Sequence, residues 1–365
     1  MRSMTWVSGL AAVLVLAGCT SEAPPEGGQQ PDPSASPSAS SPESQTPSGT
    51  PSQTPTEPTE TEEPAPARPI SVLGLAEQRH RGDRLRLGAV REQTDLYTSY
   101  DVTYRSRSTT GPEQGGEVSY TISGVLNVPT GRGPFPAVVL AHGYIDPAVY
   151  ERGQGMTRER GYLAARGYIA LHVDYRNHAE SDDDPRYQTR MRLGYSADVI
   201  AAVKALRSSP DVPVDDDRMA LFGRSMGGGV ILKALVAEPS LVQAAAPWAS
   251  VSSLEEDNFR QFMSEPGDTR GQEVVAAHGS PTGSPEFWRE NSSRPYFDGI
   301  TEPVLMVHGR FDDTCPPPWA TATQRALVKA GVNSQLEWYD DGHAFGPAFN
   351  AAMDRTVTFF DTQLG

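Results

Sequence analysis

Cysteine is nearly absent from this sequence: Cys19 and Cys315 are the two in 365 residues, so no disulfide framework can hold the fold. Basic side chains are also in deficit, with 31 Lys and Arg against 46 Asp and Glu and a formal net charge of −15. An acidic surface repels phosphate backbones, so we expect no nucleic-acid partner. No apolar run reaches the roughly 18 to 20 residues that a membrane-spanning helix needs.

The first nineteen residues have the pattern of a targeting signal. Arg2 supplies a positive start, and Val7 to Ala17 form a short apolar run that ends in Leu16-Ala17-Gly18-Cys19. Small residues before a cysteine resemble the bacterial lipobox. The resemblance implies a lipoprotein signal peptide over residues 1–18, cleavage before Cys19, and acylation of Cys19. The protein would then be extracytoplasmic and attached to the bacterial cell membrane through a lipid anchor alone. The alternative is a plain secretory signal and a secreted protein.

Residues 19–68 are predicted to form a disordered linker. Pro, Ser and Thr fill 28 of the 48 positions from 20 to 67, and large apolar side chains are absent. Such a segment buries too little apolar surface to offset the entropy of ordering. We interpret it as a tether between the membrane and a folded domain over residues 69–365.

The folded domain alternates predicted strands with predicted helices. Strands are expected at residues 100–105, 120–128, 137–141, 168–173, 218–222, 244–248, 304–307 and 335–339. Glycine-rich residues 111–116 join the first two as in a hairpin. Helices are expected at residues 157–166, 197–206, 226–236, 324–330 and 353–362. Repeated β-α-β units predict an α/β fold, with a mostly parallel sheet and helices on both faces. Ligands in such sheets bind at the carboxyl ends of the strands.

The strongest motif is Gly223-Arg-Ser225-Met-Gly227, between a predicted strand and a predicted helix. It matches the G-x-S-x-G nucleophile elbow, whose turn is so tight that side chains at both glycine positions would clash. The turn lifts the Ser225 hydroxyl above the sheet. The alternative is a glycine-rich turn with a bystander serine.

A serine nucleophile needs a base within hydrogen-bond reach, and that base needs a carboxylate to orient it. His343, in Asp341-Gly-His343 after the last strand, is the candidate base. Asp312, after the strand at 304–307, is the favoured carboxylate, although spacing does not exclude the adjacent Asp313. The other histidines are better explained as loop or packed residues: His142, His172, His178 and His308, with His80 and His278 outside any motif.

The chain order Ser225, Asp312, His343 is that of α/β-hydrolases. Acyl transfer also needs N–H groups aimed at the developing oxyanion. We expect the backbone N–H groups of Met226 and Tyr144 to supply them. The Tyr144 hydroxyl either contributes to the chemistry or its ring packs at the cleft wall.

These motifs (HGY after a strand, GRSMGG, HGRFDD and DGHAF) resemble the catalytic domain of the prolyl oligopeptidase and dienelactone hydrolase group, over about residues 95 to 365. The resemblance implies an α/β-hydrolase fold with an eight-stranded sheet. It transfers Ser225, Asp312 and His343 as the catalytic triad and Tyr144 and Met226 as oxyanion donors. Prolyl oligopeptidases usually carry a propeller domain, for which the roughly 30 structured residues before the first predicted strand leave no room.

The expected function is therefore a serine hydrolase, preferably a carboxylesterase, that acts on a small-molecule ester through an acyl-enzyme without a cofactor. The alternatives are a prolyl-oligopeptidase-like peptidase for short peptides and a non-catalytic lipoprotein that binds an envelope component.

Residues 251–300 form an insertion that is either a lid or a structural excursion. The acidic run at 180–184 lacks the ligand spacing of a calcium loop, no zinc spacing is present, and Cys315 is interpreted as a packing residue.

Overall fold

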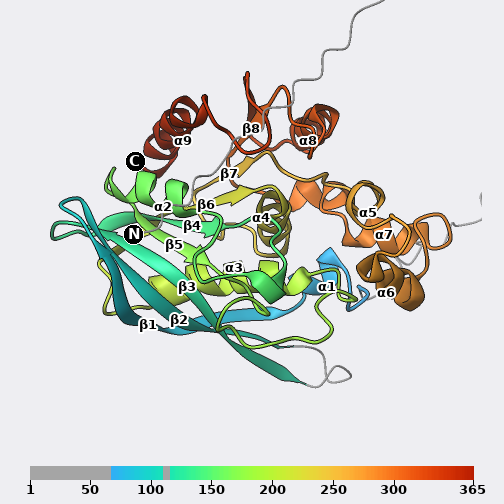
Figure 1. Cartoon of the computed structure of the whole chain (residues 1–365), viewed down its shortest axis with the longest axis horizontal. Coiled ribbons are helices and arrows are strands. Elements are labelled where there is room, and N and C mark those ends of the chain that lie inside the picture. Colours follow the sequence, from blue (N-terminus) through green and yellow to red (C-terminus); the bar gives the residue numbers. More distant parts are fainter. Residues whose placement is uncertain (1–66, 110–115) are drawn as a thin grey trace, which may run out of the picture. The chain divides into compact units, whose positions relative to one another are not determined.

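The structure, a computed structural model, describes residues 67–109 and 116–365 (Figure 1). The predicted signal peptide, Cys19 and nearly all of the predicted linker lie outside these residues, as does most of the glycine-rich loop at 111–116. Within the described ranges, no helix combines the length and the apolar character needed to cross a membrane.

One sheet of nine strands forms the centre of the fold. Its strands are β1 (Arg79–Gln93), β2 (Tyr97–Thr109), β3 (Glu117–Pro129), β4 (Phe135–Ala141), β5 (Ile169–Val173), β6 (Val214–Arg224), β7 (Ala244–Trp248), β8 (Val304–Gly309) and β9 (Ser334–Tyr339). They lie in the order β1-β2-β3-β5-β4-β6-β7-β8-β9. Strands β4 to β9 pair in parallel, whereas β1, β2 and β3 are antiparallel to their neighbours.

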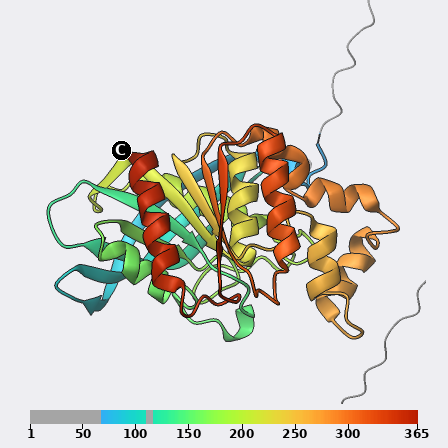
Figure 2. The same cartoon turned by 90° about the horizontal axis from the view of Figure 1, so that it is seen from above.

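Helices cover both faces of this sheet (Figures 1 and 2). They are α1 (Val72–Ala76), α2 (Thr157–Ala164), α3 (Leu193–Arg207), α4 (Met226–Ala237), α5 (Glu255–Phe262), α6 (Thr269–His278), α7 (Pro285–Asn291), α8 (Pro317–Lys329) and α9 (Phe349–Leu364), with short 3₁₀ turns η2 (Pro147–Val149) and η3 (Arg294–Gly299). Helices α2 and α9 share one hydrophobic core, and α3, α4 and α8 share the other. The chain therefore has the α/β-hydrolase architecture that the sequence predicts.

Strand β4 shows why the central strands are continuously apolar. Ala137, Val139 and Ala141 belong to the core beneath α3 and α4, and Val138 and Leu140 belong to the core beneath α2 and α9. All five are fully buried. Successive side chains of a strand point to opposite faces, so a strand covered on both sides needs apolar residues at every position.

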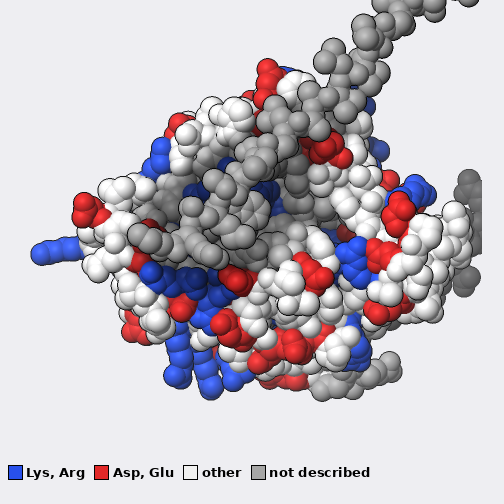
Figure 3. Space-filling model, in the orientation of Figure 1, with Lys and Arg blue, Asp and Glu red and all other residues white. Residues whose placement is uncertain are grey.

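All eight predicted strands are present, but the predicted strand number is wrong because β1 adds a ninth. Its sequence, RHRGDRLRLGAVREQ, alternates apolar residues only at Leu85, Leu87 and Ala89, and most of its side chains are exposed. Backbone pairing with β2 holds it in the sheet. Lys and Arg side chains gather along the edge formed by β1 and β2 (Figure 3). A strand that is stabilised mainly by its backbone rather than by a buried face leaves only a short periodic signal in the sequence.

The helices differ from prediction mainly in their starts. Helix α8 begins at Pro317 rather than at 324, with prolines in its first turn. Proline suits that position because its missing N–H would have no acceptor there. The insertion at 251–300 contains α5, α6, α7 and η3, none of which was predicted.

Three histidines that were predicted as loop or packed residues lie together in the core. The ring of His142 stacks on Tyr150 at 4.7 Å between centroids, and it meets His172 and His178 edge-on at 5.5 Å and 5.1 Å. The Tyr150 hydroxyl donates to Asp174 Oδ1 at 2.7 Å. Burial lowers the pKa of His142 to about 3, and it lowers the pKa of His172 and of His178 below the ordinary value. All three rings are therefore neutral at pH 7.

We expect the free energy of unfolding to fall as the pH is lowered from 7.5 to 5.5. Unfolded histidines take up protons near pH 6.5, whereas these folded ones do so at lower pH, so the unfolded chain binds more protons in this window. Each such histidine contributes a slope of at most about 1.4 kcal/mol per pH unit. Burial raises the pKa of Asp174 and of Glu302, which acts in the opposite direction. Burial also lowers the pKa of His80 and of His308, so five histidines act against these two carboxyl groups. Urea unfolding at the two pH values measures the effect, and equal or greater stability at pH 5.5 would contradict it.

Candidate active site

Ser225 occupies a strained turn between β6 and α4. Its backbone has φ 56° and ψ −122°, a conformation that a non-glycine residue keeps only when its surroundings enforce it. A Cβ on Gly223 would collide with the backbone of Gly227, and a Cβ on Gly227 would collide with the carbonyl of Ala141 in β4. The Ser225 N–H donates to the Trp248 carbonyl at 2.9 Å. The two glycines thus allow the tight turn and the close approach of α4 to the sheet.

His343 and Asp312 are brought together from the loops that follow β9 and β8. His343 Nδ1 lies 2.9 Å from Asp312 Oδ2 and 3.1 Å from Oδ1. Asp312 is 3% exposed, and its Oδ1 accepts the N–H groups of Thr314 and Cys315 at 3.0 Å and 2.8 Å. Asp313 is exposed and contacts the Thr314 hydroxyl instead. Of the two aspartates that spacing left open, Asp312 is the one that holds the imidazole, and its hydrogen bond leaves Nε2 as the ring's accepting nitrogen.

The loop that carries His343 is fixed by two residues to which the sequence assigned no role. Asp341 accepts the backbone N–H of Gly342 and that of Ala348, each at 2.8 Å. Burial opposes its ionisation, but backbone hydrogen bonds outweigh burial and lower the pKa of Asp341. From α2, Arg158 donates to the carbonyls of residues 344 and 345 at 2.8 Å and 2.9 Å. Asp341 belongs to the DGH motif, so the sequence could have indicated a role for it. No pattern near Arg158 in the sequence predicts its contact with the loop that carries His343.

Ser225 and His343 line the same cavity. Among the hydrogen bonds of the described residues, none joins Ser225 Oγ to His343. The Ser225 hydroxyl contacts the Cys315 thiol, and rotation about its single χ1 bond would redirect it. Burial raises the pKa of Cys315 to about 12, so this residue is a protonated thiol at neutral pH and not a reactive thiolate.

The two predicted amide donors flank the serine. After β4 the chain passes directly over Ser225, where a Cβ on Gly143 would lie 3.2 Å from the Ser225 Cβ. Tyr144 follows at once. Met226 is the first residue of α4, so its N–H is one of the helix N-terminal amides that have no acceptor within the helix. A helix N-terminus also favours negative charge.

The Tyr144 ring forms part of the cavity wall. It is 41% exposed and lies between two guanidinium groups, with the Arg192 Cζ 5.0 Å and the Arg270 Cζ 5.2 Å from its centroid. The ring thus lies at the cavity wall, and both roles considered for Tyr144 stay predictions.

A cavity of about 440 Å³ opens beside Ser225. Its apolar lining consists of Met191, Met226, Val230, Val251, Phe262 and Met263. The insertion at 251–300 supplies one wall, through the last three of these residues and through Glu255, Asn258 and Arg270. Other aromatic residues of the insertion pack among themselves: Phe259 meets Trp288 at 4.8 Å between ring centroids, and Phe287 and Trp288 are buried. The insertion thus shapes the cavity, and its buried aromatic residues belong to the same hydrophobic core as α3 and α4.

Carboxylates of the acidic run at 180–184 form hydrogen bonds and ion pairs with neighbouring parts of the protein. Asp182 Oδ2 accepts the N–H of Thr121, and Asp184 lies 3.6 Å from Arg176. Glu180 pairs with Arg152 at 2.8 Å. These contacts hold the loop against neighbouring elements and occupy its carboxylates.

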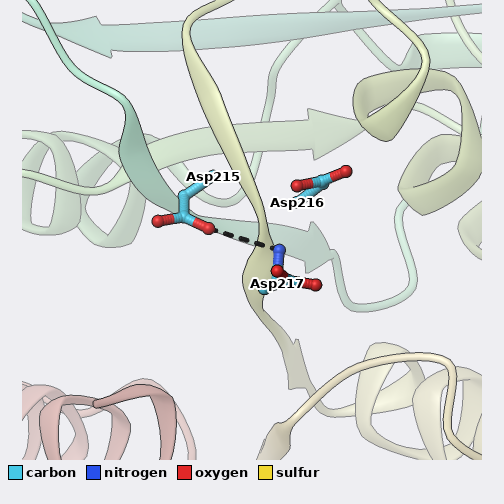
Figure 4. A group of neighbouring side chains, drawn as sticks. All are labelled: Asp215, Asp216 and Asp217. Atoms are coloured by element: carbon cyan, nitrogen blue, oxygen red, sulfur yellow. Dashed lines mark hydrogen bonds between the residues drawn. The ribbon is translucent and has the colours of Figure 1, made fainter.

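Within the described ranges, the carboxylates grouped closely enough to hold a metal ion are Asp215, Asp216 and Asp217 (Figure 4). They lie near the start of β6, at the other end of this strand from Ser225. Asp215 already binds Arg218 at 2.7 Å and accepts the Asp217 N–H. The group is partly neutralised and has no part in the geometry around Ser225.

A strained serine at a strand–helix turn, a buried Asp–His pair and this sheet define the α/β-hydrolase class. The model of the prolyl oligopeptidase family matches residues 155–365. That match covers more than half of the chain, so the protein belongs to the prolyl oligopeptidase family.

Relatives with esterase names and relatives with peptidase names both match the chain. The bis(hydroxyethyl) terephthalate hydrolase of Streptomyces coelicolor is 31% identical over 151 residues, which are 41% of this chain and 42% of that protein. Dipeptidyl peptidase 4 of Felis catus is 26% identical over 196 residues, which are 51% of this chain and 24% of that protein. The match therefore spans less than half the length of either relative.

Solved structures show the same fold. An acetyl xylan esterase from Paenibacillus sp. R4 superposes with a TM-score of 0.57 at 21% identity, over 80% of this chain and 92% of that one. An acylaminoacyl peptidase superposes with a TM-score of 0.53 at 18% identity, over 75% of this chain and 49% of that one.

We expect Gly227→Ala to lower the free energy of unfolding by more than about 2 kcal/mol, because the new methyl group would overlap backbone atoms that cannot move independently of β4. Gly346→Ala is the matched control: its Cβ would have no heavy atom within 4 Å, and its φ is not left-handed. The control should change stability by less than about 1 kcal/mol. Urea unfolding of both variants measures the difference, and equal stabilities would contradict the proposed steric constraint.

Proposed function

We propose that this protein is a serine hydrolase of small esters, with Ser225 as nucleophile, His343 as general acid and base, and Asp312 as the carboxylate that orients His343. The observation that carries the proposal is the bond of 2.9 Å between His343 Nδ1 and buried Asp312, in the same cavity as the strained Ser225. Family membership and the esterase relatives support it.

The reaction proceeds in two halves. Ser225 Oγ attacks the ester carbonyl while His343 Nε2 takes its proton, and the buried Asp312 carboxylate stabilises the imidazolium that forms. The N–H groups of Met226 and Tyr144 receive the oxyanion. Collapse expels the alcohol, which takes the proton from His343 and leaves an acyl-Ser225. Water, deprotonated by His343, then attacks the acyl-enzyme, and the bond to Ser225 Oγ breaks as Oγ takes the proton back from His343, which releases the acid and restores the enzyme.

The cavity supports an ester of modest size as substrate. It has a volume of about 440 Å³ and mainly apolar walls, within the range of sites for small molecules. The alternative is hydrolysis of short peptides, which the prolyl oligopeptidase relationship supports. An alkoxide leaves more readily than an amine, so the two activities place different demands on the acid role of His343.

We also propose that the mature protein is acylated at Cys19 and acts outside the cytoplasm, attached to the bacterial cell membrane. The lipobox-like sequence at residues 16–19 and the Pro/Ser/Thr-rich segment that follows support this location. Without acylation, the same signal would direct secretion.

A fluorophosphonate probe should label the protein and should fail to label Ser225→Ala, because the reagent needs an activated hydroxyl. Ser225→Ala should also lose at least about 10⁴-fold in the turnover of p-nitrophenyl esters. Ser119→Ala, which removes an exposed hydroxyl from β3, is the control and should keep both properties. Unchanged labelling of Ser225→Ala would reject Ser225 as the nucleophile.

The same turnover assay with aminoacyl p-nitroanilides tests the alternative function, hydrolysis of short peptides, since a peptidase should cleave the anilides as well as the esters.

Cys19→Ser should shift the protein from the membrane fraction to the soluble fraction of the producing bacterium, because the acyl chains would have no attachment site. Cys315→Ser serves as the matched cysteine control and should leave fractionation unchanged. Fractionation followed by immunoblotting measures the outcome, and a Cys19→Ser protein that stays with the membrane would contradict acylation.

A further inference from the structure

One arginine in the cavity wall has no carboxylate partner. Within the described ranges, the Lys and Arg residues that line the cavity are Arg192, Lys233 and Arg270. Lys233 Nζ lies 2.8 Å from Glu255 Oε1, and Arg270 Nε donates to Asp268 Oδ1 at 3.0 Å, so both of these charges are balanced. Among the residues that the structure describes, no Asp or Glu forms an ion pair with Arg192. The cavity wall therefore carries one uncompensated positive charge.

The Arg192 guanidinium group lies against two other residues of the cavity wall. Its Nη1 is 3.8 Å from Met226 Sδ, and its Cζ is 5.0 Å from the centroid of the Tyr144 ring. Met226 follows Ser225 in the chain, and both Met226 and Tyr144 line the cavity. The charge of Arg192 is thus in the part of the cavity that is formed by the residues flanking Ser225.

A buried glutamine holds one side of this guanidinium group. Gln188 is 5% exposed, and its Oε1 accepts from Arg192 Nε at 3.2 Å and from Nη2 at 2.8 Å. Because a guanidinium group only donates, the atom of Gln188 that faces it is the oxygen. Gln188 thus fixes the plane of the guanidinium group without neutralising its charge.

Two N–H groups of Arg192 have no acceptor in the described structure. A guanidinium group has five N–H donors. Two of them donate to Gln188, and a third points to the thioether of Met226, which is a weak acceptor. Nη1 and Nη2 therefore each keep one N–H group. These two nitrogens form the end of the fork that binds a carboxylate through parallel hydrogen bonds.

The position of Arg192 is unfavourable for the fold alone. Met191 and Arg192 both have φ 53°, a left-handed conformation that side chains other than glycine rarely adopt. Arg192 is also the N-cap of α3, where its side chain makes no capping hydrogen bond and the first turn contains no acidic residue. A helix N-terminus disfavours a cation. Strain of this kind is typical of residues that serve a site.

We propose that Arg192 binds a carboxylate group of the substrate through Nη1 and Nη2, so that the preferred substrates are esters that also carry a free acid group. A carboxylate is planar and accepts two parallel hydrogen bonds from a guanidinium group. Its single negative charge balances the one uncompensated charge of the wall, whereas a phosphate dianion would leave a negative charge in a mainly apolar cavity. This inference rests on the proposed role of Ser225.

Electrostatic support of the oxyanion is a different role for the same guanidinium group. A charge that stabilised the oxyanion would speed the hydrolysis of every ester alike. Binding of a substrate carboxylate acts on acidic esters alone. Acidic and neutral esters of matched shape therefore separate the two roles.

The experiment compares such matched esters in two series. In the first, the mono-p-nitrophenyl esters of adipic and suberic acids are compared with those of the corresponding monoamides. In the second, p-acetoxybenzoate is compared with p-acetoxybenzamide, which places the acid group on the alcohol side. The quantity measured is the ratio of kcat/KM for the acid ester to that for the amide ester. Comparing this ratio between wild type and variant cancels the intrinsic reactivities of the esters.

Arg192→Gln should lower this ratio at least about tenfold in at least one series, because hydrogen bonds between charged groups are the strong ones. Arg192→Lys keeps the charge but has no fork, so its ratio should lie between those of the wild type and Arg192→Gln. Hydrolysis of the amide ester shows that each variant is folded. The matched control is Arg186→Gln, which removes the same charge from an exposed arginine that does not line the cavity, and it should keep the wild-type ratio.

The outcomes distinguish this inference from the proposed function. Equal losses for the acid and amide esters in Arg192→Gln would reject carboxylate binding and would leave the oxyanion role for Arg192. A ratio that is the same in wild type and Arg192→Gln in both series, while p-nitrophenyl acetate is hydrolysed, would overturn this inference alone. A wild-type protein that hydrolyses none of the esters would overturn the proposed function and this inference with it.

Discussion

The parallel pairing of β4, β6, β7, β8 and β9 is the constraint on which every distance in the site depends. Ala141 pairs with Gly223, Arg224 with Trp248, and Gly309 with Tyr339, so the carboxyl ends of these strands lie at one edge of the sheet. The loops that leave these ends carry the serine, the carboxylate and the imidazole. Because a strand's side-chain period is two, a slip of one residue in any pair would exchange side chains between the two cores, and the shift along the strand, about 3.3 Å, would separate the three groups.

Within that frame, hydrogen bonds rather than cations stabilise the buried carboxylate. Asp312 accepts from two backbone N–H groups and from the His343 ring. The nearby His308 ring is buried with its Nε2 2.9 Å from the Cys315 carbonyl, and burial lowers its pKa, so it adds no positive charge at neutral pH. The charge of Asp312 is thus available to the one imidazole that it holds. This arrangement suits a group that must stabilise an imidazolium during part of a reaction and release it afterwards.

The sequence predicted the parts of the site whose constraints are local. The glycines around Ser225 and the strands that precede 142, 225, 310 and 340 left clear patterns, because steric limits and burial act on neighbouring residues. Strand β1 left only a short alternation at residues 85–89, since backbone pairing holds most of it. The contact of Arg158 with the loop at 344–345 joins residues 186 and 187 positions apart, about half the length of the chain, and no pattern near either partner marks it. The ion pair that joins Lys233 on α4 to Glu255 on α5 likewise depends on tertiary structure, which local sequence does not specify.

The ion pair of Lys233 and Glu255 lies in the cavity wall and adds little to stability. Buried ion pairs contribute little to folding stability, because desolvation cancels most of the attraction between the charges. Asn258 Nδ2 lies 3.3 Å from Glu255 Oε1 and donates to the Ser252 carbonyl, so the pair is linked to the backbone of the insertion. The rest of the cavity wall is mainly apolar, and this surface would hold the body of an ester beside Ser225.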